Sequence, residues 1–62
     1  MNMLRQARLK IDMSQLELMK KTGIYFSTIS RIERGWLNPT KEQKEKLATA
    51  LKVEETWLFP NS

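Results

Sequence analysis

The chain has 62 residues and a mass of 7.3 kDa, so we expect residues 1–62 to form a single domain. It contains no Cys and no His, which excludes disulfides, thiolate metal sites and catalysis by a Cys nucleophile or a His base. No apolar run approaches the roughly 18 residues of a membrane span, and 11 Lys and Arg against 7 Asp and Glu give a net charge of +4.

The positive charge is confined to the first part of the chain. Residues 1–36 carry seven basic and three acidic side chains, whereas residues 37–62 carry four of each. A one-sided basic surface attracts polyanions such as nucleic acids. The charge alone is equally compatible with a basic surface that is only solvated.

Helical periodicity without strand signals predicts an all-α chain with five helices. The first helix is predicted at residues 2–10. The second opens with Ser14-Gln15-Leu16-Glu17, a capping box in which the Ser hydroxyl and the Glu carboxylate bind backbone N–H groups. Gly23 is expected to end this helix in a left-handed conformation.

Only residues 23–25 separate the second helix from a third, predicted at residues 26–34 and ended by Gly35. A helix, a three-residue turn with Gly and another helix form a unit in which the two helices cross steeply. A second capping box, Thr40-Lys41-Glu42-Gln43, opens a fourth helix at residues 41–51.

A short fifth helix is predicted at residues 54–59. We expect its Trp57 and Leu58 to belong to the core. Phe59, together with Trp36 and Leu37, is left open, because these side chains would form an apolar patch suited to self-association if they were exposed.

The third helix has two different faces. Its Ile residues, three apart, should face inward, while Ser27, Arg31 and Arg34 recur on the opposite face, with Ser30 beside them and Phe26 at the leading end. Arg binds the O6 and N7 edge of guanine, Phe packs on a thymine methyl, and a helix fits the major groove of DNA. An ordinary solvated face is the alternative, but such a face does not need an aromatic side chain.

Residues 4–59 resemble the helix-turn-helix domain of the XRE family, the Cro and phage-repressor type. The segment from Ser14 to Gly35 carries the resemblance, and Asn38-Pro39 and Ala50-Leu51-Lys52-Val53 follow as in that family. The most specific parts of the matching segment are the Ser-Gln start, the central Gly23 and the run Ile-Ser-Arg-Ile-Glu-Arg-Gly that ends at Gly35. The resemblance implies a five-helix lambda-repressor-like DNA-binding domain with its helix-turn-helix at helices 2 and 3.

The resemblance also implies roles for individual residues. Base-reading positions match Phe26, Ser27 and Arg31. Positions that contact or flank the DNA backbone match Gln15, Ser30, Arg34 and Asn38, and we add Tyr25, whose phenol could reach a phosphate. For Asn38 the alternative is an Asn that only forms the turn before Pro39. Arg8 and Glu33 match a structural pair that ties the first helix to the end of the third.

Some residues depart from the family pattern. Tyr25 stands where Ser or Thr usually caps the recognition helix, so we expect a weaker cap. Lys41 and Lys44 replace apolar residues, so the fourth helix should be less buried at its start.

The predicted function is therefore a sequence-specific transcriptional regulator that binds double-stranded DNA as a homodimer, with helix 3 in the major groove of a near-palindromic operator. We expect a cytoplasmic protein, not an enzyme, with no metal, cofactor, membrane partner or small-molecule ligand. The alternative is a protein-interaction module or antitoxin on the same fold. A phage-type repressor and a restriction–modification controller also remain open.

Overall fold

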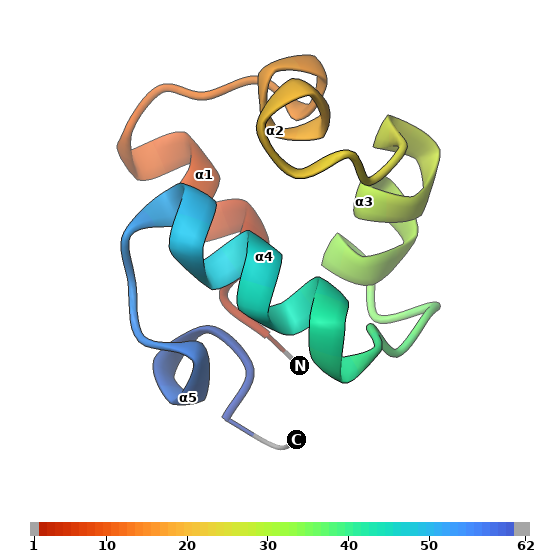
Figure 1. Cartoon of the computed structure of the whole chain (residues 1–62), viewed down its shortest axis with the longest axis vertical. Coiled ribbons are helices and arrows are strands. Elements are labelled where there is room, and N and C mark those ends of the chain that lie inside the picture. Colours follow the sequence, from red (N-terminus) through yellow and green to blue (C-terminus); the bar gives the residue numbers. More distant parts are fainter. Residues whose placement is uncertain (1, 61–62) are drawn as a thin grey trace.

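The computed structural model describes residues 2–60, which form five helices and no strand (Figure 1). The helices are α1 (Leu4–Lys10), α2 (Gln15–Thr22), α3 (Phe26–Glu33), α4 (Lys41–Leu51) and α5 (Glu55–Leu58). The all-α, five-helix prediction is therefore confirmed, with α2 and α3 as the helix-turn-helix.

The first helix begins at Leu4, two residues later than predicted. The side chain of Asn2 explains the difference, because its Oδ1 accepts a hydrogen bond from the Leu4 N–H at 3.0 Å. Its Nδ2 donates to the carbonyl oxygen of Ile32 at 2.9 Å, which ties the start of the chain to the end of α3. No sequence pattern predicted this role for Asn2.

Both predicted capping boxes are present. The Ser14 hydroxyl accepts from the Glu17 N–H at 3.0 Å while a carboxylate oxygen of Glu17 accepts from the Ser14 N–H at 2.9 Å. Thr40 and Gln43 make the same reciprocal pair at 3.1 and 2.9 Å. The hydrogen bonds from Ser14 lower the pKa of the Glu17 carboxyl below its ordinary value.

Gly23 and Gly35 end α2 and α3 as predicted, and both have a left-handed φ of +77°. The same conformation occurs at Asp12 and Lys52, with φ of +57°. In both places the next residue returns a hydrogen bond to the carbonyl five residues earlier, for example from the Val53 N–H to the Ala48 oxygen at 3.1 Å. These are Schellman ends built without glycine.

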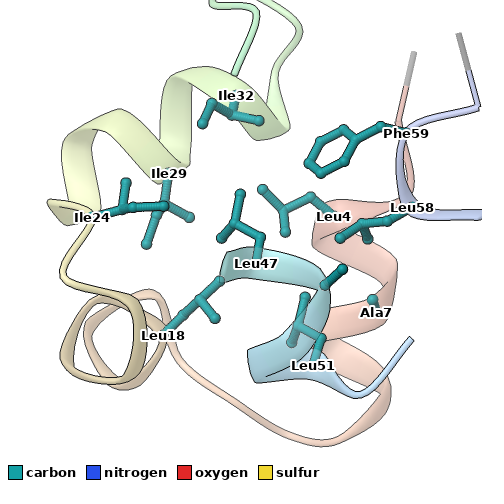
Figure 2. Packing of buried hydrophobic residues seen from close by; sticks show 11 residues of the cluster. Leu4, Ala7, Leu18, Ile24, Ile29, Ile32, Leu47, Leu51, Leu58 and Phe59 are labelled. Carbon is teal, nitrogen blue, oxygen red and sulfur yellow. The ribbon is translucent and has the colours of Figure 1, made fainter. Parts of the chain in front are cut away.

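The core is formed by inward-facing side chains of all five helices (Figure 2). Leu47 of α4 lies between Leu18 of α2 and Leu4 of α1, and α3 contributes Ile29 and Ile32 (Figure 2). The remaining members are Ala7, Ile24, Ala48, Leu51, Leu58 and Phe59. Burial of this set holds the outer helices around α4.

The prediction that Trp57 belongs to the core is wrong, because 45% of it is exposed. Within the single turn of α5, Leu58 and the following Phe59 turn inward instead. The start of α4 is open, as expected: Lys41 is exposed and pairs with Glu55 at 3.0 Å, and Lys44 is only partly buried.

Candidate nucleic-acid interface

The turn between α2 and α3 is fixed by a buried hydroxyl. The Oγ1 of Thr22 donates to the Leu18 carbonyl oxygen at 2.8 Å and accepts from the Ile24 N–H at 3.1 Å. Gly23, between them, supplies the left-handed residue. Ile24, the next residue of the turn, is buried in the core. The turn therefore sets the direction in which α3 leaves α2.

One side of α3 is anchored in the core and the other faces away from the molecule (Figure 1). Ile29 and Ile32 are fully buried and point toward Leu47 and Leu4 (Figure 2). The opposite face consists of the predicted base-reading and flanking residues. Phe26, Arg31 and Arg34 are exposed, and Ser27 and Ser30 are partly buried.

Two aromatic rings stand at the start of α3. Tyr25, the N-cap residue, stacks on Phe26 with ring centroids 4.8 Å apart and an interplanar angle of 25°. Tyr25 makes no side-chain capping hydrogen bond, as expected from the replacement of Ser or Thr. The two side chains are 60% and 42% exposed.

The end of α3 is closed by a Schellman motif. The Trp36 N–H donates to the Arg31 carbonyl oxygen at 2.9 Å, and the Gly35 N–H donates to that of Ile32 at 3.0 Å. The Arg34 guanidinium lies over the Trp36 ring, 5.0 Å from its centroid. Asn38 is exposed in the loop that follows.

A buried polar network connects α1, α2 and α3. Arg8 donates from Nε to Glu33 Oε2 at 2.7 Å, from Nη2 to Oε1 at 3.1 Å, and from Nη1 to the Met13 carbonyl oxygen at 2.9 Å. Gln15 donates from Nε2 to Glu33 Oε1 at 3.1 Å. One carboxylate thus fixes both the first turn of α2 and the end of α3.

A polar hollow of about 520 Å³ lies over this network. It is lined by Arg5, Arg8, Gln15, Ser30, Glu33 and Arg34. Three of the predicted backbone-flanking residues therefore meet in one place, whereas Tyr25 and Asn38 lie outside it. Arg5 was not among the predicted site residues. Its spacing of three from Arg8 along a basic helix is the signal that places both on one face.

The surface of residues 2–60 carries no group of three or more acidic side chains that could hold a metal ion. Over the same residues, none of the helices has the length and apolar character required to span a bilayer.

Comparison with known proteins identifies this arrangement. The helix-turn-helix family model matches residues 4–58. Two uncharacterized helix-turn-helix transcriptional regulators from Archaeoglobus fulgidus are 33% and 34% identical over 58 residues, covering 90% of this chain and 82% and 83% of theirs. The crystal structure of the restriction-modification controller protein C.AhdI from Aeromonas hydrophila superposes with a TM-score of 0.85 at 38% identity, covering 90% of this chain and 85% of that one.

The family match spans nearly all of the described chain, and its members are DNA-binding regulators that act without catalysis. The chain therefore belongs to the XRE-type helix-turn-helix family and is a DNA-binding transcriptional regulator, not an enzyme.

Proposed function

We propose that the protein reads a specific sequence of double-stranded DNA with the outer face of α3 in the major groove. The observation that carries the proposal is the two-sided helix. Ile29 and Ile32 fix α3 in the core, and Phe26, Ser27 and Arg31 stand on the side that is left open. Arg31 supplies the paired N–H donors that match guanine, and Ser27 supplies a short hydroxyl.

The polar hollow is the proposed site for the DNA backbone. Arg5 and Arg34 are exposed at its wall, and Gln15 and Ser30 complete it. Neutralisation of phosphates by these guanidiniums would release counterions, so affinity should fall steeply with salt. Tyr25 and Asn38 are assigned to flanking backbone contacts on either side of α3.

We further propose that residues 1–62 act as one domain that binds as a symmetric homodimer. One such module buries too little DNA surface for high specificity. Trp36 and Leu37, 72% and 39% exposed, form an apolar patch just beyond the end of α3. We place the second copy on this patch, so that the dimer would present two α3 helices to the two half-sites of a near-palindromic operator, which lie about 34 Å apart on DNA.

The similarity to the controller protein C.AhdI supports a narrower role, the regulation of a restriction–modification system. The similar proteins come from an archaeon and a bacterium, in which DNA lies in the cytoplasm, so the site of action would be the cytoplasm. Enrichment of genomic fragments on the immobilised protein tests this role. Promoters of an endonuclease or methyltransferase gene are expected, and their absence among the enriched fragments would contradict it.

Selection from a random duplex pool tests the main proposal. The selected duplex and a scrambled one are then titrated by electrophoretic mobility at two salt concentrations. We expect a near-palindromic sequence bound about a thousandfold more tightly than the scramble. Weak binding without any enriched sequence would overturn the proposal and favour a protein-interaction module on this fold.

A further inference from the structure

The aromatic pair at the start of α3 is not part of the core. The buried cluster is complete without it, and the neighbours Ile24 and Ile29 supply the inward contacts at this end of α3. Tyr25 does not cap the helix through its hydroxyl either. Two adjacent aromatic side chains are therefore kept at the surface, beside a basic face, without a role in holding the fold together.

The two rings are arranged as a unit in which one supports the other. Tyr25 lines a hollow of about 340 Å³ between α3 and α4, whose wall includes Thr28, Gln43 and Lys46. Phe26 is not part of that wall; it is the first residue of the helix, and 42% of it is exposed. The stacked Tyr25 ring thus restricts the directions that the Phe26 ring can take.

We propose that this pair is a binding site for the C5-methyl group of a pyrimidine, with Phe26 as the contacting residue and Tyr25 as a positioning residue. The inference rests on the proposed function, because it requires the start of α3 to face the major groove. In that groove the methyl of thymine is the apolar feature that a base pair presents. The Phe26 side chain has no donor or acceptor, so it is suited to that feature alone.

A site without polar atoms differs from a site that reads a base through hydrogen bonds. Phe26 cannot distinguish the O4 acceptor of thymine from the N4 donor of cytosine, since it binds neither. It responds only to the presence of the methyl. Thymine should therefore be preferred to uracil, and 5-methylcytosine to cytosine, by the same factor at the same position.

The test uses the selected operator with single-base changes. Each thymine is replaced in turn by uracil, and the position that responds is then rebuilt as a cytosine–guanine pair with and without the C5-methyl. Burial of one methyl predicts a loss of about fourfold in affinity for each methyl removed, in both base-pair backgrounds. Removal from both half-sites of a dimer operator predicts about fifteenfold.

Variants of the pair provide the controls. Phe26→Ala should abolish the methyl effect in both backgrounds, and Tyr25→Phe, which keeps the ring, should retain it. Tyr25→Ala should reduce it while specificity at other positions is kept. Arg31→Ala weakens binding but should leave the ratio between methylated and unmethylated duplexes unchanged. Circular dichroism checks that each variant is folded.

Sequence-selective binding that is indifferent to the methyl at every pyrimidine would overturn this inference and leave the proposed function intact. A methyl effect in the thymine background that is absent in the cytosine background would also overturn it, because the reader would then require polar atoms. Absence of selective binding to any duplex is the separate result that counts against the proposed function itself.

Discussion

Arg8 and Glu33 join α1 to α3 through two hydrogen bonds, of 2.7 and 3.1 Å, with only 9% and 4% of their side chains exposed. Glu33 also accepts the amide of Gln15. The pair therefore connects the scaffold to both helices of the helix-turn-helix. Its removal should affect the placement of α3 as well as the stability of the domain.

Removal of one partner of this pair should destabilise the domain. Arg8→Met leaves a buried carboxylate with Gln15 alone, so we expect a loss of about 3 kcal/mol or more in the free energy of unfolding. The double variant Arg8→Met with Glu33→Met should lose less than the sum of the two single changes. Urea unfolding of the four proteins measures this coupling, and additive losses would mean that the two side chains do not interact in solution.

Arg31 is expected to read a base. Arg31→Ala should cost about 1–3 kcal/mol on the preferred operator and relax the preference at one base position. Lys10→Ala, which removes an exposed charge from the last turn of α1, is the matched control and should alter neither the affinity nor the base preference. Repeated selection with each variant measures the preference. An equal loss on every duplex would assign Arg31 to the phosphates instead.

Gln15 is expected to contact the DNA backbone and not the bases. Its amide is held by Glu33 at the mouth of the polar hollow, so Gln15→Ala should weaken binding to all duplexes by a similar factor. The measurement compares the variant and the parent protein on the operator and on scrambled DNA. A changed sequence preference would show that Gln15 contacts a base.

The left-handed residues predict two opposite effects on stability. An added Cβ at Gly23 meets nothing within 4 Å, so Gly23→Ala should cost about 1 kcal/mol through its φ of +77° alone. Lys52→Gly removes the same strain at φ +57° and should stabilise the domain by about 0.5 kcal/mol. Thermal unfolding distinguishes the two, and a neutral Gly23→Ala would mean that the turn relaxes.

The two capping boxes should differ in their response to acid. The pKa of Glu17 is lowered by its hydrogen bonds to Ser14, so its contribution is present above the ordinary carboxyl pKa of about 4.3 and is lost as pH falls through the lowered value. Glu17→Gln makes the box resemble the uncharged pair of Thr40 and Gln43. Stability measured from pH 6 to pH 3 should decline more for the parent protein than for this variant. Parallel declines would show that Glu17 contributes nothing to acid sensitivity.

Features determined by neighbouring residues in the sequence were predictable. Both capping boxes, the ends at Gly23 and Gly35, and the apolar spacing of α3 depend on contacts within one or two turns, and the helices formed there. The arrangement of the outer α3 face followed from the same spacing. What these side chains bind stays a prediction.

Features without a local sequence signal were not predictable. Trp57 was predicted to belong to the core, but a helix of one turn is too short for its sequence to show which side faces inward. The bond from Asn2 to the Ile32 carbonyl crosses 30 positions and has no sequence signature. The left-handed turns at Asp12 and Lys52 lack the glycine that would have predicted them.

The contact of Arg34 with Trp36 offers a fluorescence signal for DNA binding that is intrinsic to the protein. If Arg34 leaves the indole ring to bind a phosphate, the cation 5.0 Å from the ring centroid is removed and the fluorescence of Trp36 should change. The sequence contains one other tryptophan, Trp57, so Trp57→Phe leaves Trp36, just beyond the end of α3, as the only tryptophan. Occupancy of the operator can then be followed in real time without any attached label.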